Sequence, residues 1–170
     1  MNNVSTGLSE KLYLSQNYNS FIFMVNFREQ ANFIWSVADL LRGDYKQADY
    51  GKVILPLTIL RRLDCLLMPT KQDVLKQWPK IKDNSDEVID LALNRTTKYK
   101  FNNRSNYDFA KLAADPEHIA ANLRAYISGF SLGVRDIMEQ FSFDYQIERM
   151  DKANTSHYCI HVLCILGDKN

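Results

Sequence analysis

The residues with the clearest chemical potential form a basic and aromatic segment between residues 94 and 106. Its sequence is NRTTKYKFNNRSN, in which no carboxylate interrupts the cations and aromatic rings. The cations are Arg95, Lys98, Lys100 and Arg104, and the rings are Tyr99 and Phe101. Cations give salt-dependent affinity for a phosphate backbone, amides and hydroxyls such as Asn103 and Ser105 donate to phosphates, and rings pack on sugar or base. These residues predict a DNA-binding surface. The alternative is a solvated loop whose two rings anchor it to the core.

Two further cations, Arg61 and Arg62, lie within an apolar stretch of the chain. Consecutive helix positions point about 100° apart, so the two side chains cannot face one partner equally. We expect one of them to form a buried or half-buried contact with Asp64 or Asp39. The alternative is that one arginine, together with Lys52, faces DNA or a neighbouring subunit. The pattern leaves open which arginine is structural.

The tail from His157 to Cys164, HYCIHVLC, carries imidazole and thiol groups, which are good zinc ligands. It lacks the paired C-x₂-C arrangement of a structural zinc site, and its alternation with apolar residues favours a β-prone or packed tail. We therefore predict no metal site. His118 is expected at the surface or at a helix cap, and no serine or cysteine has a nucleophile motif. We predict no catalytic residue and no cofactor bound by this chain.

Length and composition indicate one compact domain. A chain of 170 residues with 46% hydrophobic content can fill a single core. With 21 basic and 20 acidic residues the net charge is +1, so any contact with nucleic acid must come from a local patch. The three cysteines suggest no disulfide framework, which suits a reducing compartment, and no apolar run approaches the length of a membrane span. We predict a cytoplasmic protein.

Helical periodicity dominates the elements that would position these residues. Apolar residues recur at three- and four-residue steps from Phe27 to Leu41, and Gly43 occupies the position of a left-handed helix cap. A second helix, apolar over most of its circumference, follows to residue 67, with a kink at Pro56 or a start near Leu55. It is expected to be central to the core.

The rest of the chain predicts further helices over residues 71–78, 85–93, 107–114, 116–130, 132–141 and 144–154, with residues 94–106 as a non-helical break. The third helix is expected to stop before Pro79, and Asp115 and Pro116 are expected at the N-cap and first position of a helix. The predicted fold is all-α, an irregular bundle of short and medium helices.

The predicted domain organisation has three parts. Residues 1–23 are rich in Asn and Ser and show no sustained helical period, so they are expected to form an N-terminal extension, with disorder as one interpretation. Met24 is then a candidate natural start. Residues 24–154 are expected to form the helical domain, and residues 155–170 an atypical C-terminal tail.

Several short motifs lie in this helical region. They include Leu41-Arg42-Gly43, Tyr50-Gly51-Lys52, Ile54-Leu55-Pro56, Leu60-Arg61-Arg62-Leu63-Asp64 and, near the end, Phe143-Asp144-Tyr145-Gln146-Ile147. Together they resemble the N-terminal helical domain of type I restriction-modification DNA methyltransferase modification subunits. The segment 101–105 is similar to the family's F-Y-N-x-S pattern, although Asn102 stands where tyrosine is usual. The resemblance covers about residues 24–154.

This resemblance implies a non-catalytic part of an adenine-specific DNA methyltransferase. It implies an assembly with modification and specificity subunits and, for cleavage, restriction subunits, in which the domain helps to clamp DNA and to sense methylation. S-adenosylmethionine is implied only for the catalytic domain, and this sequence has no G-x-G turn and no Asn/Asp-Pro-Pro-aromatic loop. We therefore expect a modification subunit truncated before its catalytic domain, with no activity by itself. The alternatives are a standalone helical protein-interaction module and a vestigial fragment.

Overall fold

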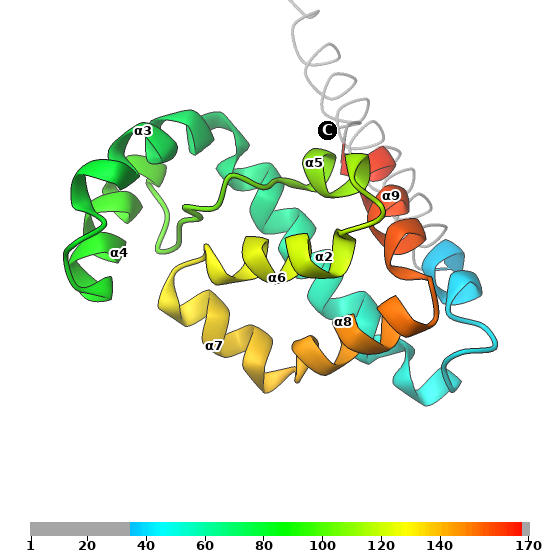
Figure 1. The fold of residues 1–170 in the computed structure, drawn as a ribbon. Helices are drawn as coiled ribbons and strands as arrows, with labels where there is room; N and C mark the ends of the chain where they lie inside the picture. Colours follow the sequence, from blue (N-terminus) through cyan, green and yellow to red (C-terminus); the bar gives the residue numbers. More distant parts are fainter. Residues whose placement is uncertain (1–34, 168–170) are drawn as a thin grey trace, which may run out of the picture. The chain divides into compact units, whose positions relative to one another are not determined.

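The computed structural model describes residues 35–167 (Figure 1). Contacts divide the chain into two units, Met1–Ser36 and Val37–Asn170, and every element named below belongs to the second unit. Two predictions concern residues outside this range. They are the N-terminal extension of residues 1–23 and the first part of the helix predicted from Phe27. Residues 35–40 are helical, and Gly43 has a φ of +104°, as the predicted left-handed position requires.

Helices account for the regular structure of the second unit. In chain order they are η1 (Gln47–Asp49), α2 (Tyr50–Leu67), η2 (Met68–Thr70), α3 (Lys71–Ile81), α4 (Asp86–Thr97), α5 (Phe109–Ala114), α6 (Ile119–Ser128), α7 (Leu132–Gln140), α8 (Phe143–Lys152) and α9 (Ser156–Gly167). The described residues contain two isolated β-bridges and no strand. The predicted all-α fold is therefore confirmed for the part of the chain that the structure describes.

The long helix α2 runs through the bundle and packs against α8 and α9, while α6 packs against α5, α7, α8 and α9 (Figure 1). Aromatic side chains fill the space between these helices. Phe109, Tyr126 and Phe130 are fully buried and meet edge to face, with neighbouring ring centroids 5.8 and 5.1 Å apart. Such edge-to-face contacts are a favoured geometry for aromatic rings in a core.

Helices α3 and α4 form a hairpin at one end of this unit (Figure 1). Its two helices share a small hydrophobic cluster of Val74, Ile89 and Leu93, against which Trp78 and Ile81 pack. The hairpin thus has apolar packing of its own. Helix α4 lies on the side of the unit opposite α8 and α9 (Figure 1).

Two prolines lie inside helices, which contradicts the predicted stop before Pro79 and, of the two alternatives at Pro56, the start near Leu55. Pro56 is a buried residue of α2, which begins six residues earlier at Tyr50 rather than near Leu55. Pro79 lies in the last turn of α3, which continues to Ile81. A proline removes one backbone donor and is tolerated best in the first turn of a helix, so both positions carry a cost. Packing of the residues around each proline keeps the chain helical.

Two other predicted boundaries are wrong, the end of α4 and the start of α6. Helix α4 continues beyond Leu93 to Thr97, because both residues are buried on one face. Helix α6 begins at Ile119, with His118 rather than Asp115 in the N-cap position. The Asp115 side chain instead accepts hydrogen bonds from neighbouring side chains of the α6 end.

The sequence predicts a β-prone or packed C-terminal tail; the tail is a helix, α9, so the β-prone alternative is wrong and the packed one holds. Cys159, Ile160 and Leu163 are buried, at a spacing that forms one face of a helix. That face packs on α2 and α5. Within the described residues, no helix is both long enough and apolar enough to cross a membrane.

Candidate nucleic-acid interface

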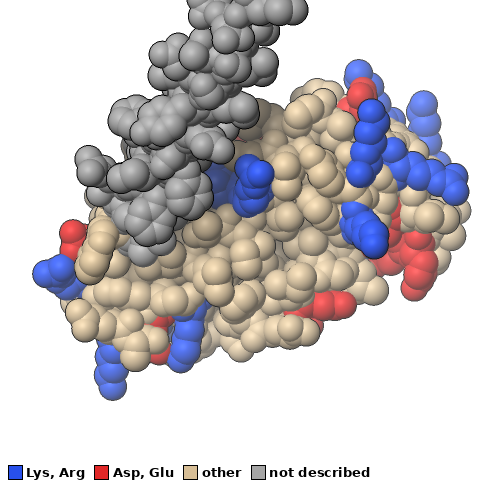
Figure 2. Space-filling model, turned by 180° about the vertical axis from the view of Figure 1, so that it is seen from behind, with Lys and Arg blue, Asp and Glu red and all other residues tan. Residues whose placement is uncertain are grey.

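The predicted basic segment begins as the last turn of α4 and leaves the helix through Lys98, whose φ of 61° is left-handed. The side chains of Arg95, Lys98 and Lys100 are exposed. Among residues 35–164, no ion pair engages these three cations. Figure 2 shows basic side chains gathered over the end of the molecule that holds α3 and α4. These cations are therefore available to a polyanion.

The two rings of the segment lie together at the surface. Tyr99 and Phe101 stack with their centroids 5.1 Å apart and their planes 15° from parallel. Tyr99 is 40% exposed, whereas Phe101 is half-buried. The carbonyl of Phe101 accepts a hydrogen bond from the Thr97 hydroxyl at 2.9 Å, which ties the segment back to α4.

Asn103, a predicted DNA contact, is a core residue and is only 2% exposed. Its Nδ2 donates to the carbonyl of Tyr126 at 3.1 Å. Its Oδ1 accepts from Lys71 Nζ at 3.1 Å and from the backbone N–H of Ser105 at 2.8 Å. Asn103 is therefore too buried to meet a phosphate, and its role is to join the basic segment to α3 and α6.

The neighbouring Asn102 is fully buried and serves the same purpose on the other side of the segment. Its side-chain amide donates to Asp90 and Asn94 of α4, each at 3.0 Å. Its carbonyl accepts from the backbone N–H of Ser131 at 3.1 Å, at the start of α7. The usual tyrosine of the resembled pattern is thus replaced here by a residue that crosslinks three parts of the fold.

Arg104, also predicted to contact DNA, is engaged within the protein. Its guanidinium pairs with Asp86 at 3.0 Å and lies 4.7 Å from the centre of the Trp78 ring. Arg135 pairs with the same carboxylate at 2.8 Å. Hydrogen bonds from Arg135 and then Arg104 lower the pKa of Asp86. Arg104 therefore fastens the basic segment to the α3–α4 hairpin.

A close backbone approach completes this anchoring. The backbone N–H of Arg104 donates to the carbonyl of Gly129 at 2.7 Å. A Cβ atom added at Gly129 would lie 2.5 Å from Ser105 Cβ and 2.6 Å from Ser105 N, so only glycine fits without a shift. Ser105, half-buried, is thus also a positioning residue. The seven residues predicted from the sequence divide into exposed cations and an anchoring set.

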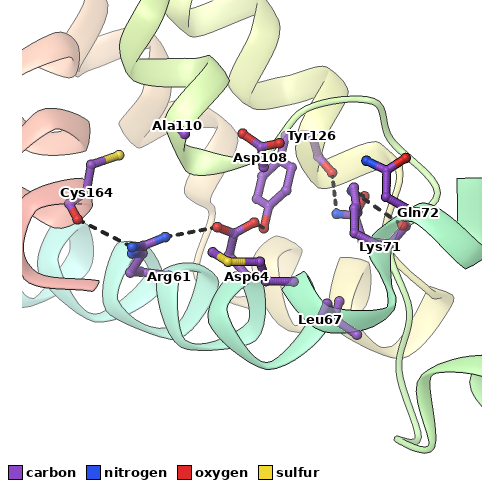
Figure 3. Close-up of a pocket in the computed structure, with 11 residues that line it drawn as sticks. Arg61, Asp64, Leu67, Lys71, Gln72, Asp108, Ala110, Tyr126 and Cys164 are labelled. Carbon is purple, nitrogen blue, oxygen red and sulfur yellow. Dashed lines mark hydrogen bonds and ion pairs between the residues drawn. The ribbon is translucent and has the colours of Figure 1, made fainter. Parts of the chain in front are cut away.

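A second group, the buried polar cluster, consists of the charged residues Arg61, Asp64 and Lys71 and the polar residues Asn103 and Tyr126, of which Figure 3 labels all but Asn103. Arg61 Nη1 pairs with Asp64 Oδ2 at 3.0 Å, and Tyr126 donates its hydroxyl to Asp64 Oδ1 at 3.0 Å. Arg61 Nε also donates to the Leu163 carbonyl of α9 at 3.1 Å. These contacts join α2, α6 and α9.

The pKa values within this cluster reflect burial. Burial raises the pKa of Asp64, and it lowers the pKa of Lys71 to about 8. Burial, followed by the nearby Asp64 charge, raises the pKa of Tyr126 well above its ordinary value. The cluster borders a cavity of about 260 Å³ that Met68 and Asp108 also line. Because the carboxylate and guanidinium already bond protein groups, we interpret the cluster as structural.

The remaining predicted contacts lie on α2. Arg62 is exposed, and Lys52 is exposed and pairs with Asp49 at 2.8 Å. Asp39, the other candidate partner for an arginine, pairs with Arg42 at 2.6 Å. The structure thus places Arg61 in the core and Arg62 on the surface, a distinction that the sequence left open.

The chain was compared with models of known protein families. Residues 30–158 match the model described as the HsdM N-terminal domain. The chain belongs to this family. It is an N-terminal domain of a type I restriction-modification modification subunit. The family match covers the whole basic segment and the cluster residues of α2, α3 and α6, and it ends within the first turn of α9. Searches of curated proteins and of solved structures gave no match.

Proposed function

We propose that this HsdM N-terminal domain contributes a DNA-contacting surface to a type I restriction-modification complex and has no catalytic role itself. Arg95, Lys98 and Lys100 are the proposed contacts. The observation that carries the proposal is their placement: three exposed cations project from a segment that the buried residues Asn102 and Asn103 fix to the core. A preorganised surface loses less side-chain and backbone entropy on binding.

The proposed contacts act on the DNA backbone and carry no sequence information. Each cation that neutralises a phosphate releases a counterion, so affinity falls with salt concentration. Arg95 and Lys98 also lie at the C-terminal end of α4, where the helix dipole favours positive charge. The stacked Tyr99 and Phe101 rings add an apolar surface beside the cations.

The net charge of +1 indicates that this surface acts with partners. We propose that the domain works in the cytoplasm beside modification and specificity subunits, with restriction subunits in the cleaving complex. There it helps to clamp DNA and to sense adenine methylation, while S-adenosylmethionine is bound by a separate catalytic domain. Target choice then belongs to another subunit.

The outer face of α4 supports a second role in protein assembly. Val88 and Leu91 lie three residues apart on the helix and are 51% and 59% exposed. Residues three apart are neighbours on a helix surface, so the two side chains form a small apolar patch. Lys52 and Arg62, exposed on α2, are further candidate subunit contacts. This second role corresponds to the protein-interaction alternative.

Charge reversal of the exposed cations tests the DNA proposal. Lys98→Glu/Lys100→Glu, assembled with the modification and specificity subunits, should bind DNA at least about tenfold more weakly in a gel shift. The slope of log affinity against log salt should fall by about two, one for each lost phosphate contact.

The control is Lys46→Glu/Lys152→Glu, which makes the same charge change at exposed positions before η1 and at the end of α8, where Lys152 also loses its pair with Glu148. It should leave the salt slope unchanged. An unaltered slope in the Lys98/Lys100 variant would contradict the DNA-contact proposal.

A separate pull-down with Val88→Asp/Leu91→Asp tests the assembly role, because loss of partner capture without a change in the salt slope assigns the patch to protein contact.

A further inference from the structure

Helix α9 brings His157 and His161 onto neighbouring turns. The two residues form an H-x₃-H sequence, and the prediction of no metal site did not take this pair into account. In a strand, positions four apart are separated by about 13 Å. In a helix they lie one above the other on the same face, about 6 Å apart. The helical tail therefore changes the chemistry available to these imidazoles.

The geometry of the pair suits a shared metal ion. The ring centroids are 5.8 Å apart and the ring planes are inclined by 43°. A metal ion bonded to one nitrogen of each ring at about 2.0–2.1 Å spans two imidazoles of this separation after a small rotation of each side chain. His161 is exposed and His157 is half-buried, so an ion can enter from solvent.

The surroundings of His157 indicate which atom would bind. Its Nδ1 is buried and has no hydrogen-bond partner among the described residues. A ligand arriving from solvent therefore meets the other ring nitrogen, Nε2. Cys164 lies on the same helix face, seven residues after His157, but its thiol donates to the Phe109 carbonyl at 3.0 Å and lines the cavity of the buried polar cluster.

We propose that His157 and His161 form a labile two-histidine site for a divalent transition-metal ion of the zinc or nickel type. Neutral imidazole suits these ions, and water would complete the coordination. In the described part of the chain, no group of three or more His, Cys, Asp or Glu side chains is placed to hold a metal, so the site is open and exchangeable. The ion would crosslink two turns of α9. This inference is independent of the proposed DNA contact.

Calorimetric titration of the full chain with Zn²⁺ and, separately, Ni²⁺ tests the site. The native chain should bind one ion, and His161→Gln should bind at least about tenfold more weakly, which corresponds to about 1.4 kcal/mol. His118→Gln, a change at an exposed histidine outside α9, should bind as the native chain does. Circular dichroism should show the same helical fold for all variants.

A second variant separates the H-x₃-H geometry from the number of histidines. Tyr158→His/His161→Gln keeps two histidines on α9, but adjacent residues on a helix do not face each other. Tyr158 is 56% exposed, so the substitution should not disturb the core. This variant should bind as weakly as His161→Gln.

Nuclear magnetic resonance of the imidazoles gives an independent readout. Zn²⁺ should shift the resonances of His157 and His161 together and leave those of His118 in place. Native-like affinity in the Tyr158→His/His161→Gln variant, or the absence of binding by the native chain, would overturn the proposal.

Discussion

Lys71 and Lys98 show how one residue type serves two purposes in this domain. Lys71, in the buried polar cluster, is 9% exposed and donates to Asn103, and burial lowers its pKa to about 8. Lys98, on the basic segment, is exposed at the end of α4. A cation fixed in the core contributes to one folded arrangement, whereas a cation at the surface remains available to an outside anion.

The two regions meet at Asn103. Its side chain accepts from Lys71 and donates to the Tyr126 carbonyl, so a residue of the basic segment belongs to the buried polar cluster. The cluster in turn holds α2, α6 and α9 together through Arg61 and Asp64. The buried polar cluster thus anchors the basic segment, and the cations proposed to contact DNA project from the anchored segment.

The largest effect on stability is expected when the buried polar cluster loses its carboxylate, Asp64. Asp64→Asn removes the carboxylate that pairs with Arg61 in the core and replaces an acceptor of the Tyr126 hydroxyl. Breaking a buried pair costs about 3–5 kcal/mol, so the free energy of unfolding in urea should fall by about that amount. Asp39→Asn, at an exposed pair, should cost at most about 1 kcal/mol.

A double variant sharpens this expectation. Arg61→Met/Asp64→Leu removes both charges and should be more stable than Asp64→Asn, because neither charge of the pair then remains in the core. Equal losses for Asp64→Asn and Asp39→Asn would contradict the distinction between the buried pair and the exposed pair.

The next largest loss of stability is expected at the contact between the basic segment and the end of α6. Gly129→Ala forces its Cβ against Ser105, with the nearest atoms a Cβ and a backbone nitrogen that cannot move independently. Overpacking of this kind costs about 1–3 kcal/mol. Thermal unfolding should show a lower midpoint, and DNA binding by the assembled complex should weaken even though no cation is changed.

Gly133→Ala is the matched control, because an added Cβ there meets no atom within 4 Å and the residue lies in α7. Alanine is favoured over glycine in a helix, so this variant should be about 0.5–1 kcal/mol more stable. A Gly129→Ala protein as stable as the native chain would show that the segment can move away from α6 at no cost.

Much of the helical architecture could be predicted from periodicity alone. The helices of residues 50–67, 132–140 and 143–152 lie close to their predicted bounds because their apolar residues recur at helical spacing. The tail could not be assigned in this way. Its apolar residues occur on most positions, and the partners that select the helix, α2 and α5, are distant in sequence.

The candidate site could be predicted only in part. Composition identified the cations of residues 95–104, but it could not separate Arg104 from Lys98. That separation depends on Asp86 and Trp78, which the chain brings beside Arg104 only when α3 and α4 pair. Burial of Asn103 likewise depends on Tyr126, from a helix that begins sixteen residues later. Local patterns report residue types, whereas exposure is set by distant partners.

The smallest change in the free energy of unfolding is expected from the titration of Lys71. Its pKa of about 8 in the folded chain lies below its ordinary value of 10.5, so between these pH values the unfolded chain binds a proton that the folded chain has lost. The free energy of unfolding should therefore rise with pH through this window, by an amount on the order of 1 kcal/mol.

Lys71→Met isolates this contribution, since it keeps a long side chain and removes the titrating group. Burial raises the pKa of Cys159 from 9.0 to about 12, which makes stability fall with pH above 9, but this effect is common to both proteins. Urea unfolding at about pH 8 and about pH 10 should thus show a rise in the native chain relative to Lys71→Met. Parallel pH profiles would mean that Lys71 titrates as an exposed lysine does, and the contrast between Lys71 and Lys98 would lose its physical basis.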